Sequence, residues 1–329
     1  MERGNHRRNQ PHHQQGFALL VVIVIMLLIS FLAGQLILNV RTELRIAANA
    51  KERAAGLSLA EAGVNLGLFR ILDKPLEYIN EQDATFAEGY EYDAFLPTGH
   101  LRYYVVNESG KIDLNKFNQT LLELFLEYMQ IDAPEREIII DSLYDWQDSD
   151  NLHRLNGAEL ETYEALDDPY IPRNGKIMEP SEFFLIHGTA PLAGKFPASD
   201  IFTTHNTTGL VNFNSLSPLM LDFLTEGDEV KKNAYREAKE LYVNLGQEHA
   251  LQILGAERFS QVRDALTYNS GNNRFYSIVV RGEAGVDEQE LADRENDNPK
   301  PPAAAHEVRV LFELHGTKVT YYSREEGWS

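Results

Sequence analysis

The densest group of oxygen ligands in this 329-residue chain lies between residues 141 and 168. Asp148 and Asp150 occupy alternating loop positions behind a predicted helix, and Glu159 follows a turn at Gly157 that can fold it back toward them. Carboxylates held close together repel one another, which favours protonation or a cation between them. Since the chain has no cysteine, hard oxygen ligands would select calcium. A structural Ca²⁺ site with Asp148, Asp150 and Glu159 as ligands is therefore one interpretation.

A solvated acidic loop is the other interpretation of the same residues. The chain has 50 acidic residues against 30 Lys and Arg, a formal net charge of -20, so acidic runs are expected on its surface. The loop also lacks the spacing of an EF-hand. The residues by themselves leave both interpretations open. The negative charge repels phosphate backbones, which argues against a nucleic-acid partner.

The motifs of the common enzyme classes are absent from the sequence. It contains no Gly-x-Ser-x-Gly, His-Glu-x-x-His, Walker or dinucleotide-binding pattern. His153 and His187 have no His or Cys neighbour at ligand spacing. Nothing sets the paired acids of residues 159–168 at the few-ångström separation that a glycosidase needs. We therefore predict that the protein is not an enzyme.

A single uncharged apolar run, Phe17–Leu38, follows a polar and basic N-terminus of 16 residues. As a helix, these 22 positions would extend about 33 Å, enough to cross a hydrocarbon core of roughly 30 Å. The basic residues favour a cytoplasmic N-terminus. The pattern predicts a single transmembrane helix over 17–38, with the rest of the chain exported.

The junction before this run separates it from other targeting signals. A secretory signal would have a shorter apolar stretch, about 7–15 residues, and an ordinary signal anchor does not explain a Gly-Phe pair at its cytoplasmic edge. QQGFALLVV resembles the class III signal of type IV pilins and type II secretion pseudopilins. The resemblance implies that residues 1–16 are a leader, that prepilin peptidase cuts between Gly16 and Phe17, and that Phe17 becomes N-methylated.

Val21 stands at the fifth mature position, where most pilins have Glu. A carboxylate in lipid is costly unless it is paired, and in pilins it is thought to neutralise the terminal amine of the subunit ahead. A first subunit has no such neighbour, so Val21 points to the tip of a filament. Loss of the motif in this chain, or membership of another family, would also explain a valine at this position.

The remaining pattern predicts an α+β fold with a long N-terminal helix and a small antiparallel pilin-like sheet. Helical spacing continues as a stalk over 39–74, ending at Pro75. Alternating β-branched and aromatic residues predict strands, at 101–107, 274–281, 307–314 and 318–323. A charged, Pro-rich connection is expected over 287–305. The sheet core, 75–114 and 271–329, would thus be interrupted by an all-helical insertion over 115–270.

Two segments of this insertion resemble each other. Asn107–Asn115 (NESGKIDLN) and Asn206–Asn214 (NTTGLVNFN) align without gaps at both terminal asparagines and at the glycine. Each precedes a predicted helix that the closing Asn or the next Ser can cap. We predict two related modules, at about 107–200 and 206–270.

The order of ESGKIDLN, LYDWQDSD, NGAELETY and EPSEFFLIHG resembles minor pseudopilin K of type II secretion systems, the general secretion pathway protein K family. The resemblance implies a calcium-binding, non-enzymatic tip subunit in the cell inner membrane, with its globular part in the periplasm. Its partners would be minor pseudopilins I and J, the pseudopilus and the inner-membrane assembly platform. It would initiate assembly, limit growth and support export of folded proteins.

Two other functions are alternatives. A minor pilin of a type IV pilus would share the N-terminal signal and the stalk. A membrane-tethered periplasmic enzyme would show turnover and an uncleaved Phe17 junction.

Overall fold

The computed structural model describes residues 14–72, 87–242, 244–295 and 305–328. Contacts divide the chain into two compact units, Met1–Ala55 and Gly56–Ser329. The main part of the predicted leader and Pro75, the predicted end of the stalk, lie outside the described residues.

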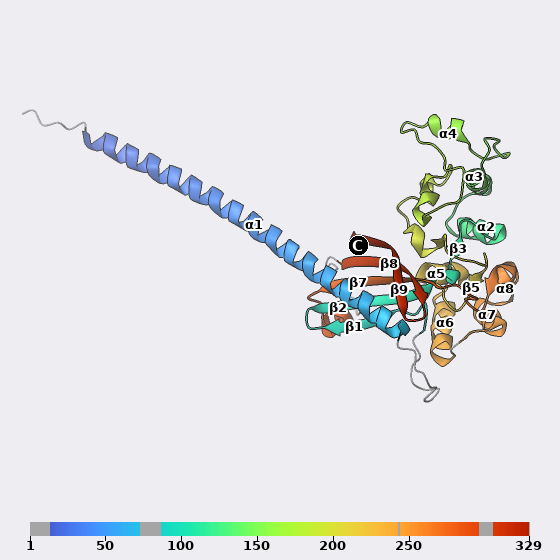
Figure 1. Ribbon diagram of the computed structural model, residues 1–329. Helices are drawn as coiled ribbons and strands as arrows, with labels where there is room; N and C mark the ends of the chain where they lie inside the picture. The colour runs from blue at the N-terminus through green and yellow to red at the C-terminus, as the bar shows by residue number, and fades with distance from the viewer. Residues whose placement is uncertain (1–13, 73–86, 243, 296–304, 329) are drawn as a thin grey trace, which may run out of the picture. The chain divides into compact units, whose positions relative to one another are not determined.

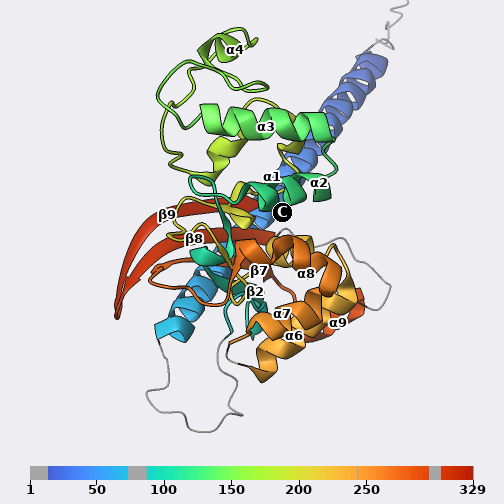
Figure 2. The ribbon, with the colours of Figure 1, turned by 90° about the vertical axis from the view of Figure 1, so that its right-hand side faces the viewer.

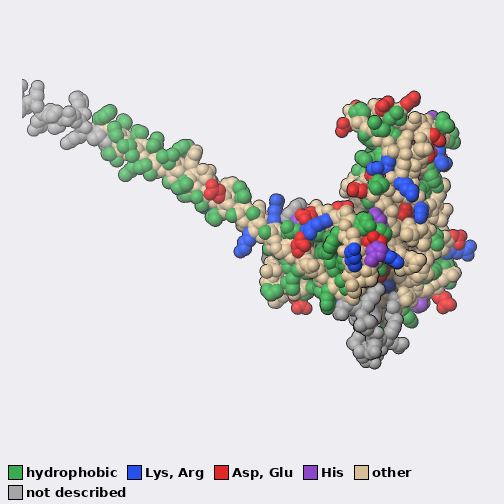
Figure 3. Space-filling model, in the orientation of Figure 1, with side chains coloured by type: hydrophobic (Ala, Val, Ile, Leu, Met, Phe, Trp, Pro, Cys, Tyr) green, Lys and Arg blue, Asp and Glu red, His purple; other side chains and the backbone are tan. Residues whose placement is uncertain are grey.

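The first unit contains most of α1 (Gln14–Leu72), including the predicted membrane segment. Its apolar window has a mean hydropathy of 2.9 and none of it is buried. Figure 3 shows the hydrophobic side chains exposed along this part of the helix, an arrangement that is unfavourable in water. In the described part of the chain this is the one helix long and apolar enough to cross a membrane, and it is compatible with a single-pass anchor.

A five-stranded antiparallel sheet organises the second unit (Figure 1). Its strands, in spatial order, are β1 (Tyr92–Leu96), β2 (Gly99–Asn107), β7 (Phe275–Ala284), β8 (Ala305–His315) and β9 (Lys318–Trp328). The four predicted strands are present. The strand β1 was not predicted, because its five residues are exposed or half-buried and lack a clear apolar alternation. Part of the predicted irregular connection is helical, α9 (Glu288–Glu295).

The last turns of α1 cover one face of this sheet. Ala60, Val64 and Leu68 are buried against Val280 and neighbouring strand residues. Gly63 permits the close approach, because a Cβ there would lie 2.3 Å from a methyl carbon of Val280. Helix and sheet thus share one apolar core.

The insertion between β2 and β7 is mainly helical (Figure 2). Its α-helices are α2 (Gln119–Tyr128), α3 (Ala133–Asp145), α4 (Leu160–Glu164), α5 (Pro218–Leu224), α6 (Glu229–Leu241), α7 (Gln247–Leu254) and α8 (Ala256–Val262). Short 3₁₀ helices lie at Glu108–Gly110, Pro180–Leu185, Ala190–Leu192, Ala198–Asp200 and Arg263–Ala265. Their apolar faces form one core around residues such as Phe125 and Phe223. The α+β fold with a helical insertion is confirmed.

The insertion also includes two parallel strand pairs that an all-helical description omits. They are β3 (Ile112–Asp113) with β4 (Phe202–Thr203), and β5 (Val211–Asn212) with β6 (Leu266–Thr267). Each strand has two residues, too few for a visible alternation. β3 and β5 are equivalent positions of the two similar segments.

The two similar segments make the same interactions. The Asn115 amide accepts a hydrogen bond from the Ile177 N–H at 2.8 Å and donates to the Ile177 carbonyl at 3.0 Å. The Asn214 amide holds Leu245 in the same way, at 2.6 and 2.9 Å. Each closing asparagine therefore fixes a distant loop to its own module. This equivalence supports a two-module organisation, whose boundaries stay a prediction.

The segments also contact each other reciprocally. A Cβ on Gly110 would lie 1.7 Å from the Ser215 carbonyl oxygen, and one on Gly209 would lie 2.4 Å from the Lys116 carbonyl oxygen. Gly209 and Ser215 each lie 99 positions after Gly110 and Lys116. The glycine of each segment thus allows the backbone of the other to approach.

Candidate functional site

Three carboxylates converge where α3 ends and α4 begins. Asp145 is the last residue of α3, Asp148 lies in the turn after it, and Glu159 immediately precedes α4. One oxygen from each lies within 4.8 Å of the others. The apolar side of α3, including Leu143, is anchored in the core of the insertion, so the acidic group has a rigid support.

The charge of this group is incompletely compensated. Asp145 and Glu159 are buried, and both Glu159 oxygens have no hydrogen-bond partner. Burial raises the pKa of each of these two carboxyls, and neighbouring carboxylates raise it further. The Arg154 N–H donates to Asp145 at 3.0 Å, but the Arg154 side chain is half exposed and therefore screened by solvent. Unpartnered buried oxygens of this kind fit a hard divalent cation.

Gly157 leaves the space that the carboxylates occupy. A Cβ at this position would lie 1.8 Å from an Asp145 carboxylate oxygen. The turn that returns the chain toward the acidic group therefore requires glycine for steric reasons.

The structure brings together two of the three predicted ligands and adds another. Asp148 and Glu159 belong to the group, together with Asp145, which was not among the predicted ligands. Asp150 lies outside it, and its carboxylate instead accepts the Leu152 N–H at 2.9 Å. The signal for Asp145 was its i, i+3 spacing from Asp148, which places both side chains on one side of a helix end.

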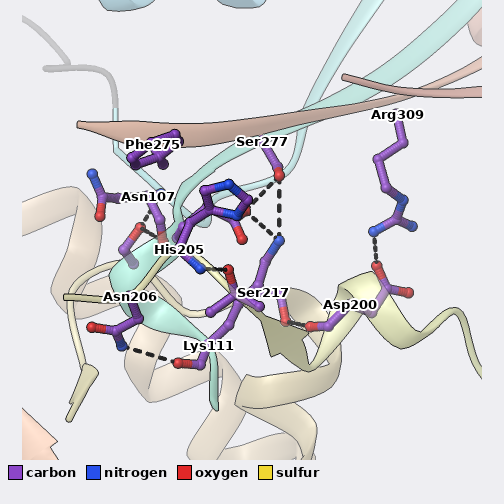
Figure 4. Close-up of polar contacts among 12 residues, drawn as sticks. Asn107, Lys111, Asp200, His205, Asn206, Ser217, Phe275, Ser277 and Arg309 are labelled. Atoms are coloured by element: carbon purple, nitrogen blue, oxygen red, sulfur yellow. Dashed lines mark hydrogen bonds and ion pairs between the residues drawn. The ribbon is translucent and has the colours of Figure 1, made fainter. Parts of the chain in front are cut away.

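Buried polar contacts hold the insertion on the sheet face opposite α1 (Figure 4). Arg309 of β8 contacts Asp200 of the insertion at 2.5 Å, and the Tyr104 hydroxyl of β2 donates to the same carboxylate at 3.2 Å. Beside them, Lys111 donates to Glu108 at 2.6 Å and to Ser277 of β7 at 3.3 Å. These buried charged pairs fix the position of the insertion on the sheet.

The predicted processing residues belong to α1. Gly16 lies in its first turn, and the Phe17 side chain is exposed. Val21, also exposed, lies one turn further on. Cleavage, methylation and the significance of Val21 stay predictions.

Residues 104–193 match the family model described as type II secretion system (T2SS), protein K. Among solved structures, the chain resembles one chain of the GspK-GspI-GspJ complex of the enterotoxigenic Escherichia coli type 2 secretion system. Identity is 16% and the TM-score 0.50, covering 88% of this chain and 100% of that chain. No curated protein matches the sequence.

A long apolar helix, a small antiparallel sheet and a helical insertion form the fold that this chain shares with the matched chain of that complex. Over residues 104–193 the chain is similar to protein K of type II secretion systems. The predicted resemblance is confirmed.

Proposed function

We propose that this chain is the tip subunit of a type II secretion pseudopilus and starts its assembly together with minor pseudopilins I and J. The observation that carries the proposal is the helical insertion, which interrupts a pilin-like sheet between β2 and β7. This large insertion would make the globular part of the chain wider than a filament's cross-section. A further subunit could then not join above it. Growth would be limited in this way, and the pseudopilus would support export of folded proteins through the outer membrane.

The N-terminal segment would deliver the subunit to this position. Prepilin peptidase would cleave after Gly16 and methylate Phe17, leaving α1 as a single-pass anchor in the inner membrane. The N-terminus would face the cytoplasm and the sheet with its insertion the periplasm, where the assembly platform lifts the subunit. Val21, without a carboxylate, suits a subunit that has no terminal amine ahead of it.

Processing can be tested with Gly16→Leu, which should block cleavage because the peptidase would meet a bulky side chain in place of glycine. We expect the wild-type chain to begin at Phe17 on N-terminal sequencing and to co-purify with I and J in detergent, and the variant to keep residues 1–16. Gly34→Leu, a matched glycine within the same helix, should still be cleaved. A mature terminus elsewhere, or co-purification with type IV pilus components instead, would contradict the proposal.

We further propose that Asp145, Asp148 and Glu159 hold a structural calcium ion. When bound, the ion would supply positive charge that offsets repulsion among these carboxylates. Its role would be to tie the loop between α3 and α4, a segment with few buried apolar side chains. The support is the pair of buried, unpartnered Glu159 oxygens.

Calcium is expected to raise the thermal unfolding midpoint of the full chain in detergent near pH 7.5, and this effect should weaken as the pH is lowered. Because the folded pKa values of Asp145 and Glu159 are raised, the stability contribution of these carboxyls is full below about pH 4 and is lost as pH rises through the raised values. A bound calcium ion offsets that loss of stability, whereas protons compete with calcium for the same carboxylates. At a free calcium concentration a hundred-fold above Kd, calcium binding raises the free energy of unfolding by about 2.7 kcal/mol.

Glu159→Gln should abolish the calcium effect and raise the calcium-free midpoint, since it removes an unpaired buried charge. Glu161→Gln, a change at an exposed neighbour, should keep the calcium effect. Equal calcium effects in the two variants would contradict the site.

A further inference from the structure

Four aliphatic side chains are exposed at the end of the insertion that consists of α4 and its flanking loops. The exposed fraction is 79% for Leu152, 92% for Leu155 and 75% for Ile171, and it is 40% for Leu166. Figure 3 shows hydrophobic and acidic side chains together over this end of the insertion. Single exposed leucines are normal on a protein surface, but a group of them marks an interaction site. We call these four residues the apolar patch.

Two loops carry the apolar patch, and both are anchored on the same aromatic support. Two members of the patch lie between α3 and α4, and the other two follow α4. Trp146, directly after α3, packs against Tyr163 of α4 with ring centroids 5.3 Å apart. Tyr170 of the second loop contacts both rings, at 6.3 and 5.3 Å. Because Trp146 and Tyr163 are buried, the two loops hold the patch over one fixed base.

Side-chain hydrogen bonds fix the backbone of the first loop while its two leucines stay in solvent. The N–H groups of Leu152, Arg154 and Asn156 each donate to a carboxylate, at 2.9, 3.0 and 3.0 Å. Arg154 and Asn156 flank Leu155, so the backbone around this highly exposed side chain is held on both sides. A loop that is fixed before binding loses little conformational entropy when a partner arrives. The patch is therefore preorganised for binding.

An acidic rim surrounds the apolar patch. Residues 148–171 include seven acidic residues and one arginine. We use the term acidic rim for the exposed carboxylates among them, Asp150, Glu161, Glu164, Asp167 and Asp168. None of these carboxylates forms an ion pair within the part of the chain that the structure describes. The arginine, Arg154, lies over the Tyr144 ring at 4.4 Å and contacts Asp145 at 3.6 Å, so it does not compensate the charge of the rim.

This charge selects one occupant among those that an apolar surface could bind. Anionic phospholipids and nucleic acids carry phosphates, which the acidic rim repels. A second copy of this chain would bring a formal net charge of -20, which opposes association at an acidic surface. Lys and Arg side chains of another protein would pair with the carboxylates around apolar contacts. The complementary occupant is therefore a basic amphipathic segment of a partner protein.

We propose that the apolar patch and its acidic rim dock a basic amphipathic segment of a partner protein. Apolar anchors of that segment, at helical spacing, contact Leu152, Leu155, Leu166 and Ile171. Its flanking Lys or Arg side chains contact the acidic rim, which orients the segment and speeds its encounter with the patch. The inference goes beyond the proposed function and uses neither α1 nor the sheet.

The absence of cysteine permits a site-specific reporter in the full chain, reconstituted in nanodiscs of neutral lipid. Ala165→Cys places one thiol at an exposed position beside the patch, to which a fluorescent dye is attached. The probe is a synthetic amphipathic helix of Leu and Lys, which should change the dye fluorescence saturably. The same peptide with Glu in place of Lys should bind with about ten-fold lower affinity or less. Added salt should weaken binding of the Leu/Lys peptide, because it screens exposed charge pairs.

Two double variants separate the apolar contribution from the charged one. Leu152→Ser/Leu155→Ser should weaken binding of the Leu/Lys peptide about ten-fold, because two exposed anchors are removed. Both leucines are more than three-quarters exposed, so the unfolding midpoint should not change. Asp167→Asn/Asp168→Asn should weaken binding and reduce its salt dependence, since it removes two carboxylates of the rim.

Val230→Ser/Leu241→Ser is the matched control, because it removes two exposed apolar side chains of α6, 77% and 75% exposed, and it should bind the peptide like the wild type. Unchanged affinity in Leu152→Ser/Leu155→Ser, or equal affinity for the Leu/Lys and Leu/Glu peptides, would overturn the proposal. Equal binding of a Ser/Lys peptide would also overturn it, since the rim would then bind any cationic chain. A dye response to anionic phospholipid vesicles without peptide would instead assign the patch to a membrane surface.

Discussion

Glu108→Gln is expected to lower the free energy of unfolding by about 3–5 kcal/mol, because it leaves the buried Lys111 ammonium without its counter-charge. Both side chains are almost fully buried, and their N–O distance is 2.6 Å. The Ser277 hydroxyl donates to the same Glu108 oxygen at 2.5 Å. Burial by itself would raise the pKa of Glu108, but Lys111 and hydrogen bonds outweigh it and lower this pKa.

The measurement is denaturant unfolding of the full chain in detergent, followed by fluorescence of Trp146, which is buried in the insertion. The double variant Glu108→Leu/Lys111→Met should recover most of the loss, because replacing a buried pair by apolar residues of similar volume is often neutral. The wild type should also lose stability in acid as Glu108 becomes protonated, since its folded pKa lies below the unfolded value. A single variant as stable as the wild type would show that Lys111 finds another partner.

Gly110→Ala is expected to cost about 3 kcal/mol, at the upper end of overpacking effects. The new Cβ would meet a backbone carbonyl oxygen of Ser215 at 1.7 Å, and backbone cannot give way as a flexible side chain can. Gly209→Ala should destabilise the protein similarly, through the Lys116 carbonyl and through its φ of 73°, a left-handed conformation that disfavours a Cβ.

Gly175→Ala is the control for these two variants, because the nearest atom to its Cβ would be 3.8 Å away. We expect its free energy of unfolding to remain within about 0.5 kcal/mol of the wild type. If Gly110→Ala behaved like this control, the two similar segments could not be in the close contact described.

Local sequence signals identified the elements whose pattern is strong. The uncharged run after Gly16 and the alternating strands β2, β7, β8 and β9 were predicted because each contains enough residues to show its period. The strand β1 and the two-residue strands of the insertion were not, because so few residues show no period. The likeness of Asn107–Asn115 to Asn206–Asn214 was visible in the sequence. Its reciprocal glycine contacts required the fold.

Some features of the candidate sites were likewise predictable from the sequence, and others required the fold. The sequence by itself predicted a processing junction at Gly16 and Phe17 and determined the acidic loop and the absence of the usual catalytic motifs, because these features depend on neighbouring residues. Tertiary structure alone decided that Asp145 replaces Asp150 beside Asp148 and Glu159, and that the loops on either side of α4 share one aromatic support. These features depend on distances between residues separated in the chain, such as Trp146 and Tyr170, which packing sets and no local pattern encodes.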